Sequence, residues 1–143
     1  MNIYFACSIT GGREFEPAYQ EITRALLADG HTVPTAMLAD SSVKEFESIV
    51  EPVEVYERDT AWIRGCDALV AEVSTPSHGV GYEVAYALAR GKPVLCLHQQ
   101  ARAVSKMLTG NRDPHLQVSA YTEPAQAVTI LQAFLVKFVT KDR

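Results

Sequence analysis

The sequence predicts an α/β protein built on one doubly wound, parallel sheet of five strands in the order 2-1-3-4-5, with helices on both faces. Apolar segments of strand length alternate along the chain with longer segments of helical periodicity. The strand-like segments are apolar at nearly every position, which is typical of parallel strands buried on both faces. The length of 143 residues and the apolar fraction of 48% fit a single domain over residues 1–143.

The first quarter of the chain predicts a strand, a turn, a helix and a second strand. Residues 3–7 form the first strand, and residues 8–13 form a turn that contains glycines. Residues 16–29 predict an amphipathic helix, which Gly30 ends. Residues 31–35 predict the second strand.

The middle of the chain predicts a loop followed by a helix. Residues 36–50 are mixed and polar, so we expect them to be the least structured segment, which could hold a mobile loop. Pro52 begins a helix whose apolar face carries Val55, Trp62 and Ile63.

The second half continues the alternation of strands and helices. Strands are predicted at residues 67–73, 94–98 and 116–120, and helices at residues 80–90, 103–108 and 124–139. The last helix has one continuous apolar face. This pattern is typical of flavodoxin-like or Rossmann-like sheets, where ligands bind beyond the carboxyl ends of the strands.

Charge and composition exclude several classes of partner. The net charge is −4 and the Lys and Arg residues are scattered, so we expect no nucleic acid polymer and at most a small nucleotide. The three cysteines and four histidines show no ligand spacing, which predicts reduced cysteines and no metal site. The N-terminal segment has neither a basic flank nor a long apolar core, so we expect no signal peptide and no membrane span. The expected location is the cytoplasm, and in a eukaryote the nucleus is also possible.

Two loops at the predicted switch point could bind a phosphate. They follow the first and third strands, which are neighbours in the order 2-1-3-4-5. Their small residues offer hydroxyls and amides that can surround a phosphate, although two ordinary polar turns are the alternative. These residues are Ser8, Thr10, Gly11, Gly12, Ser74, Thr75, Ser77, Gly79 and Gly81. Neither loop has the Gly-Lys-Ser/Thr ending of a P-loop.

Glu83 is the leading candidate for a catalytic group. It follows the second loop and is expected in the first turn of a helix, where the unpaired N–H groups favour an ionised carboxylate and an anionic substrate group. Glycoside chemistry uses a second carboxyl group. Asp59 is the candidate, because it precedes the packed side of its helix by one turn, although an exposed aspartate is the alternative. Glu57 and Glu72 are rivals.

Several motifs in order carry a family resemblance that covers nearly the whole chain. They are Tyr4-Phe5, Ser8-Ile9, Gly11-Gly12-Arg13, Asp59, Ala71-Glu72-Val73, Pro76-Ser77 and Gly79-Val80-Gly81-Tyr82-Glu83. The chain thus resembles the 2'-deoxynucleoside 5'-phosphate N-hydrolase family, within the nucleoside 2-deoxyribosyltransferase superfamily. The resemblance implies hydrolysis of the N-glycosidic bond of a (2'-deoxy)nucleoside 5'-monophosphate, which releases the base and the sugar 5-phosphate.

The resemblance also implies roles for individual residues. Glu83 would be the nucleophile on C1', Asp59 the general acid, and Tyr4 a support for the carboxylate and sugar. Glu83 must then be ionised and Asp59 protonated, which we expect from a helix N-terminus and partial burial respectively. No cofactor is implied. The implied substrate and phosphate pocket comprises Ser8, Ile9, Thr10, Gly11, Gly12, Arg13, Ser77, Gly79, Gly81 and Ser105.

Ser105 would reach the site of a neighbouring subunit, so the resemblance implies a homodimer. Thr10 is a departure, because members of the family often have an arginine there, and a threonine cannot clamp a phosphate through two bonds. Arg13 could compensate, or the phosphate could bind more weakly, or the substrate could differ.

Two other functions are compatible with the sequence. A deoxyribosyltransferase would pass the sugar from Glu83 to a second base, but that branch typically has carboxylates where this chain has Ser77 and His78. A non-catalytic nucleotide-binding module could use the same fold. The intact pair of Glu83 and Asp59 favours the hydrolase.

Overall fold

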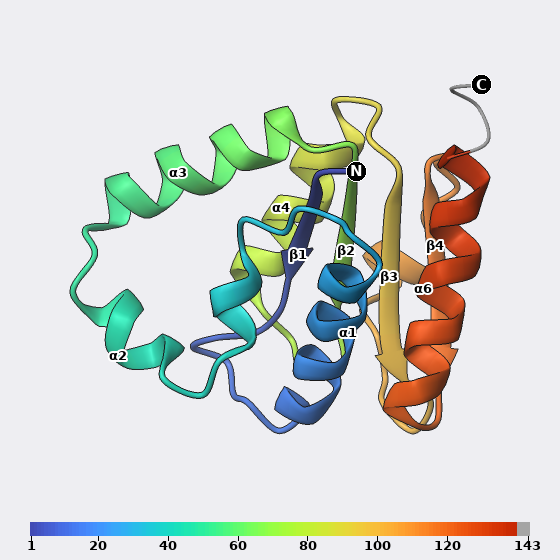
Figure 1. Ribbon diagram of the computed structural model, residues 1–143, viewed down its shortest axis with the longest axis horizontal. Coiled ribbons are helices and arrows are strands. Elements are labelled where there is room, and N and C mark those ends of the chain that lie inside the picture. Colours follow the sequence, from blue (N-terminus) through green and yellow to red (C-terminus); the bar gives the residue numbers. More distant parts are fainter. Residues whose placement is uncertain (140–143) are drawn as a thin grey trace.

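A computed structural model describes residues 1–139, and its centre is a parallel sheet covered by helices on both faces. The sheet has four strands, β1 (Ile3–Ala6), β2 (Ala68–Glu72), β3 (Val94–Gln99) and β4 (Leu116–Tyr121), in the order β1-β2-β3-β4. The helices are α1 (Glu16–Ala28), the 3₁₀ helix η1 (Ala36–Ala39), α2 (Val43–Ser48), α3 (Pro52–Gly65), α4 (His78–Leu88), α5 (Lys106–Thr109) and α6 (Pro124–Val139). Figure 1 shows α1 and α6 in front of the sheet and α4 behind it.

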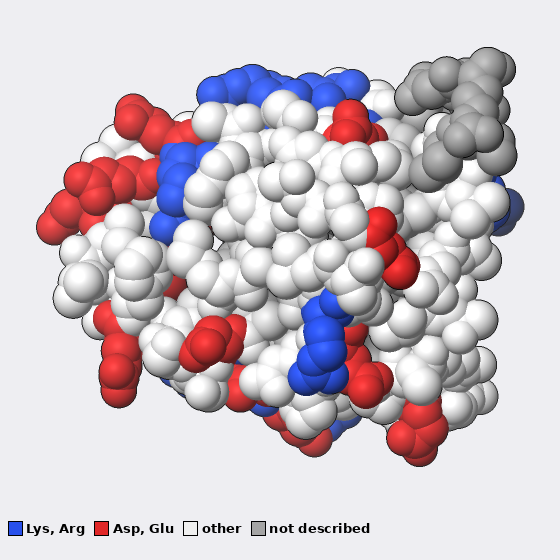
Figure 2. Space-filling view, in the orientation of Figure 1, with Lys and Arg blue, Asp and Glu red and all other residues white. Residues whose placement is uncertain are grey.

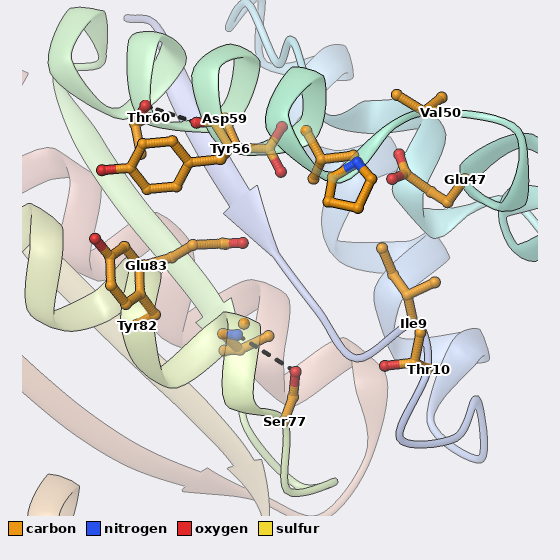
Figure 3. A pocket seen from close by; sticks show the side chains of 14 residues that line it. Ile9, Thr10, Glu47, Val50, Tyr56, Asp59, Thr60, Ser77, Tyr82 and Glu83 are labelled. Carbon is orange, nitrogen blue, oxygen red and sulfur yellow. Dashed lines mark hydrogen bonds between the residues drawn. The ribbon is translucent and has the colours of Figure 1, made fainter.

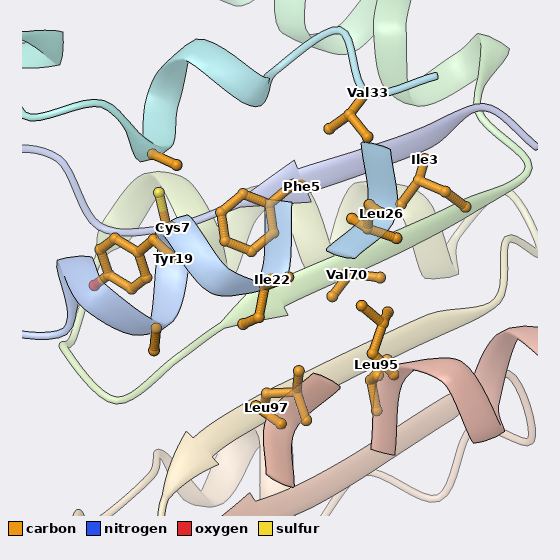
Figure 4. Close-up of a cluster of buried hydrophobic side chains, with 14 of the residues drawn as sticks. Ile3, Phe5, Cys7, Tyr19, Ile22, Leu26, Val33, Val70, Leu95 and Leu97 are labelled. Carbon is orange, nitrogen blue, oxygen red and sulfur yellow. The ribbon is translucent and has the colours of Figure 1, made fainter. Parts of the chain in front are cut away.

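Alternate residues of the buried strands divide the core into two apolar clusters. On one face, Phe5, Val70 and Leu97 pack against α1 and α6, as Figure 4 shows for part of this cluster. On the other face, Leu69 and Cys96 pack with residues of α3 and α4. The period of two along a strand therefore decides which helix layer each side chain meets.

The prediction of five strands was wrong, because residues 31–35 form only an isolated parallel bridge, between Asn2 and Thr32. The amide of Ile3 donates to the Thr32 carbonyl at 2.8 Å, which places this segment beside the outer edge of β1. Pro34 has no N–H to continue a ladder. The next β1 amide that faces this outer edge, that of Phe5, instead donates to the side-chain oxygen of Thr35 at 2.9 Å. The order of the four strands that do form agrees with the prediction.

The segment expected to be least structured also differs from the prediction. Residues 36–50 contain two short helices, η1 and α2. Leu38, Ala39 and Val43 are buried there, which gives the segment an apolar anchor on the core. The remaining predicted helices and strands agree with the structure within a few residues at each end.

Figure 2 shows one face of the molecule, on which the basic side chains form no continuous surface. In residues 1–139, no helix combines the length and apolar character that a membrane span requires. The thiols of Cys7, Cys66 and Cys96 are buried and unpaired.

Candidate active site

A cavity of about 470 Å³ opens beyond the carboxyl ends of β1 and β2, between α3, α4 and the segment that contains α2. Three acidic side chains line it, namely Glu47, Asp59 and Glu83. They come from three different helices, α2, α3 and α4. Figure 3 shows Glu83 extending from α4 into the cavity toward α3, which carries Asp59. The structure thus brings together the two predicted catalytic carboxyl groups.

Glu83 lies in the second turn of α4, and not in the first turn as the sequence predicted. The helix begins at His78, because the Ser77 hydroxyl caps it by accepting a hydrogen bond from the Val80 amide at 3.3 Å. The field of a helix terminus falls off within one turn, so it stabilises an ionised Glu83 less than expected.

Asp59 faces inward because it shares one side of α3 with Ile63, four residues later. Only 9% of its surface is exposed. Its Oδ1 accepts a hydrogen bond from Nε of Arg58 at 2.7 Å. Burial raises the pKa of Asp59 and Arg58 lowers it. The alternative of a solvated aspartate on the helix surface is therefore excluded.

Tyr4 is fully buried in β1, on the same face of the sheet as α3 and α4. Its hydroxyl interacts with both carboxyl groups and lowers the pKa of Glu83 and of Asp59, although neither contact has ordinary hydrogen-bond geometry within residues 1–139. Burial and the two acids in turn raise the pKa of Tyr4, which keeps it a neutral donor.

The two carboxyl groups disfavour each other's ionisation. Burial, followed by the charge of Asp59, raises the pKa of Glu83 to about 8. Two carboxyl groups in one partly buried site do not ionise independently, because the charge of one disfavours the charge of the other. This differs from the expectation that the helix N-terminus alone would keep Glu83 ionised.

The two loops at the switch point touch each other. A Cβ atom on Gly11 would lie 2.6 Å from the carbonyl oxygen of Pro76, which no side chain tolerates. Gly12 has a φ of 126°, a value that favours glycine. The hydroxyl of Ser8 is buried beneath them, with no hydrogen-bond partner in the described part of the chain. Ile9, Thr10, Ser77 and Gly79 line the cavity.

Arg13 is absent from the cavity lining. Its guanidinium donates to the carbonyls of Ser8 at 3.0 Å, Leu38 at 2.7 Å and Asp40 at 3.0 Å, and it pairs with Glu16 at 3.0 Å. These bonds tie the first loop to the end of η1. Arg13 thus holds the backbone of the loop, and its donors are occupied there.

Ser105 and Gly81 lie at a second cavity, of about 590 Å³, beside α4 and α5. Ser105 caps α5 and is exposed. Ser77, Val80 and Tyr82 line both cavities, so the two are adjacent. The structure therefore does not bring Ser105 into the cavity of its own subunit.

Both rival acids are excluded from the first cavity by position. Glu57 is exposed on α3, and Glu72 is buried at the end of β2 among residues of the opposite face of the sheet.

Sequence reasoning missed Glu47 and Arg58, which form an ion pair at 2.9 Å beside Asp59. Arg58 directly precedes Asp59 in the sequence, which could have indicated that it belongs to the site. No neighbouring residue or motif indicates this for Glu47. Over residues 1–139, no three His, Cys, Asp or Glu side chains gather in a way that could hold a metal ion.

Comparisons with known proteins identify the family of the chain. The model of the family described as nucleoside 2-deoxyribosyltransferase matches residues 3–128. A protein of Methanococcoides burtonii assigned by name as a 2'-deoxynucleoside 5'-phosphate N-hydrolase is 44% identical over 111 residues, which is 78% of this chain and 91% of the relative. The 5-hydroxymethyl-dUMP N-hydrolase of Mus musculus is 41% identical over 127 residues, or 85% of this chain and 73% of the relative.

Solved structures show the same fold at lower sequence identity. The CMP N-glycosidase BcmB of Clostridium botulinum superimposes with a TM-score of 0.69 at 17% identity, over 92% of this chain and 99% of that one. A 2-deoxyribosyltransferase of Leishmania mexicana gives a TM-score of 0.56 at 18% identity, over 97% of each chain. From the family model and the relatives, the chain belongs to the nucleoside 2-deoxyribosyltransferase superfamily and, within it, to the family of 2'-deoxynucleoside 5'-phosphate N-hydrolases.

Proposed function

We propose that the protein hydrolyses the N-glycosidic bond of a (2'-deoxy)nucleoside 5'-monophosphate and releases the free base and the sugar 5-phosphate. The observation that carries this proposal is the pair of Glu83 and Asp59 at one cavity, next to two glycine-containing loops. The names of the relatives support it, since they describe N-hydrolases of nucleoside 5'-phosphates.

The phosphate binds at the two loops that follow β1 and β2. The Ser8 hydroxyl has no partner among the described residues and lies buried beneath these loops, whose amides are available to the phosphate. Thr10, Ser77 and Gly79, which belong to these loops or directly follow them, line the cavity. No arginine stands at position 10, and Arg13 is held by carbonyls, so the phosphate is bound by hydroxyls and amides.

The sugar lies between the two acids, and the base lies against the apolar wall formed by Val50, Pro52 and Val55. A carboxylate oxygen of Glu83 attacks C1' while the C1'–N bond breaks, and Asp59 gives its proton to the departing base. Water then attacks C1' of the glycosyl ester. Asp59 takes the proton from this water, and Glu83 leaves as a carboxylate.

Burial raises the pKa of both Asp59 and Glu83, so that one of the two can hold a proton near neutral pH. This supports the chemistry, because the reaction needs one protonated carboxyl group. The site needs Glu83 ionised and Asp59 protonated when substrate is bound. Tyr4 favours the ionised form of Glu83. Positive charge that develops on the sugar favours that same form in the transition state. No step requires a metal or an organic cofactor.

The functional unit is a homodimer in which Ser105 reaches the neighbouring site. The second cavity supports this proposal, because it adjoins the first and is lined mainly by apolar side chains of α4 and α5. Met107 and Tyr82 lie there with 82% and 53% of their surface exposed, which is large for apolar groups on a monomer.

The three unpaired thiols suit a reducing compartment, so the expected location is the cytoplasm.

The test incubates the protein with ribo- and deoxyribonucleoside monophosphates and with the matching nucleosides, and measures free base by chromatography. We expect release from monophosphates alone, and none from Glu83→Ala. A second base is added as an acceptor in parallel, because a transferase would form a new nucleoside. If no substrate releases base under either condition, the protein is a nucleotide-binding module and the proposal fails.

A further inference from the structure

Arg58 lies between two carboxylates that come from different helices. Its Nε donates to Asp59 at 2.7 Å, and its terminal nitrogen pairs with Glu47 of α2 at 2.9 Å. Its guanidinium also lies over the Trp62 ring, 5.1 Å from the centroid. The side chains of Arg58, Glu47 and Asp59 are 21%, 13% and 12% exposed, so solvent screens these contacts only in part.

This arrangement creates a difficulty for the proposed reaction. A general acid must hold a proton, yet a guanidinium in direct contact with Asp59 favours the ionised carboxylate. The charge of Asp59 raises the pKa of Glu83, so a cation that favours the ionised form of Asp59 also favours the protonated form of Glu83. The nucleophile would then be neutral and the acid would have nothing to donate.

We propose that Glu47 is a positioning residue that shares the Arg58 guanidinium with Asp59 and thereby keeps the catalytic proton on Asp59 and the negative charge on Glu83. This inference rests on the proposed function, and it assigns a role to α2 that the reaction scheme leaves open. Arg58 is not thereby removed from Asp59. It becomes a cation whose charge is divided between two acceptors.

The charges around the pair have the signs that this role requires. The groups with the largest effects on the pKa of Asp59 and of Glu83 are Tyr4 from β1, Arg58 from α3 and Glu47 from α2. The thiol of Cys7, which follows β1, also interacts with Glu83. Glu47 raises the pKa of both acids, and Arg58 lowers the pKa of both. Arg58 contacts Asp59 and not Glu83, so its charge stabilises mainly the ionised form of Asp59. When Glu47 neutralises part of that charge, the proton is favoured on Asp59. The stacking of Arg58 on Trp62 limits where the guanidinium can move.

Glu47→Gln and Arg58→Gln test the proposal through the pH profile of kcat/KM, which reports the acids of the free enzyme. In Glu47→Gln, Asp59 is the one carboxylate left to pair with Arg58, so its ionised form is favoured more strongly. We therefore expect the profile to move about one pH unit toward acid and its maximum to fall several-fold. In Arg58→Gln, we expect a movement of similar size toward alkaline pH. Loss of packing alone would lower the maximum without moving the profile in opposite directions.

Glu45→Gln is the matched control, because Glu45 lies on the same short helix and is exposed. It removes the same charge and should leave the profile in place. Profiles of both main variants that coincide with the wild-type profile would overturn the proposal, as would movement of both in one direction.

Direct titration of the Asp59 carboxyl carbon by NMR separates this proposal from the proposed function. The pKa of Asp59 should fall in Glu47→Gln and rise in Arg58→Gln, whether or not the wild-type protein releases base. Absence of hydrolysis by the wild type would refute the function, whereas an unchanged Asp59 titration in Glu47→Gln would refute the role of Glu47.

Discussion

Buried carboxyl groups lie on both faces of the sheet near the carboxyl end of β2, and they differ in what surrounds them. Glu72 is 0% exposed, and its Oε1 accepts hydrogen bonds from the hydroxyl and from the amide of Ser74, the latter at 3.0 Å. The Ser74 hydroxyl in turn accepts from the Gln99 amide at 2.8 Å, which ties the loop after β2 to β3. Glu83 and Asp59, on the opposite face, line a cavity of about 470 Å³.

The surroundings decide the role of each acid more than burial does. Burial raises the pKa of Glu72 to about 7 and that of Glu83 to about 8, so the two are similar by this measure. Glu72 is enclosed by Tyr19, Tyr121 and Ser74, with no access to a substrate. A perturbed pKa therefore marks a functional group here only where a cavity and a second acid accompany it.

The sharpest test of this difference is Glu83→Gln. We expect base release to fall by about a thousandfold or more, because the amide can neither stabilise the cationic sugar nor form the glycosyl ester. The measurement is product formation in a single turnover. Thermal melting of the same variant at pH 8 should show no loss of stability, because the raised pKa of Glu83 means that its ionisation costs folding free energy at this pH and a glutamine avoids that cost. Activity that survived within tenfold would end the assignment of Glu83 as nucleophile.

Gly11→Ala tests whether the contact between the two loops supports phosphate binding. The new Cβ would meet the Pro76 carbonyl at 2.6 Å, so the loops must separate. We expect KM for a monophosphate to rise about tenfold, which corresponds to roughly 1.4 kcal/mol. Gly65→Ala at the end of α3 is the control, because nothing lies within 4 Å of its Cβ and alanine favours a helix. Equal KM values for the two variants would contradict the proposed phosphate site.

Glu72→Gln should change stability and leave the reaction almost unchanged. The folded-state pKa is raised, so the folded protein binds the extra proton, and stability declines as pH rises from the unfolded value near 4.5 to about 7. The variant lacks this decline, and we expect it to gain about 2 kcal/mol relative to the wild type at pH 8. Denaturant unfolding at pH 5 and pH 8 measures the difference. A large loss of kcat at unchanged stability would mean that Glu72 is catalytic after all.

Local patterns in the sequence determined much of the fold and of the candidate site. Periodicity predicted the four strands and the long helices, and it placed Asp59 beside the packed side of α3. The order of strands followed from topological rules, and this brought the loops after β1 and β2 together. The family resemblance was confirmed by the comparisons, while the roles of Glu83, Asp59 and Tyr4 stay predictions that the mutants above test.

Tertiary contacts decided the rest, because they join residues far apart in sequence. The pattern of residues 31–35 predicted a strand, yet Pro34 and the hydrogen bond that the Phe5 amide donates to the Thr35 hydroxyl limit them to one bridge. Arg13 read as a phosphate ligand, but carbonyls of Leu38 and Asp40 hold it. Glu47 meets Arg58 only when α2 folds back toward α3. Sequence periodicity reports which side of an element is apolar, whereas the partners and proton of a buried charge depend on what the rest of the chain places against it.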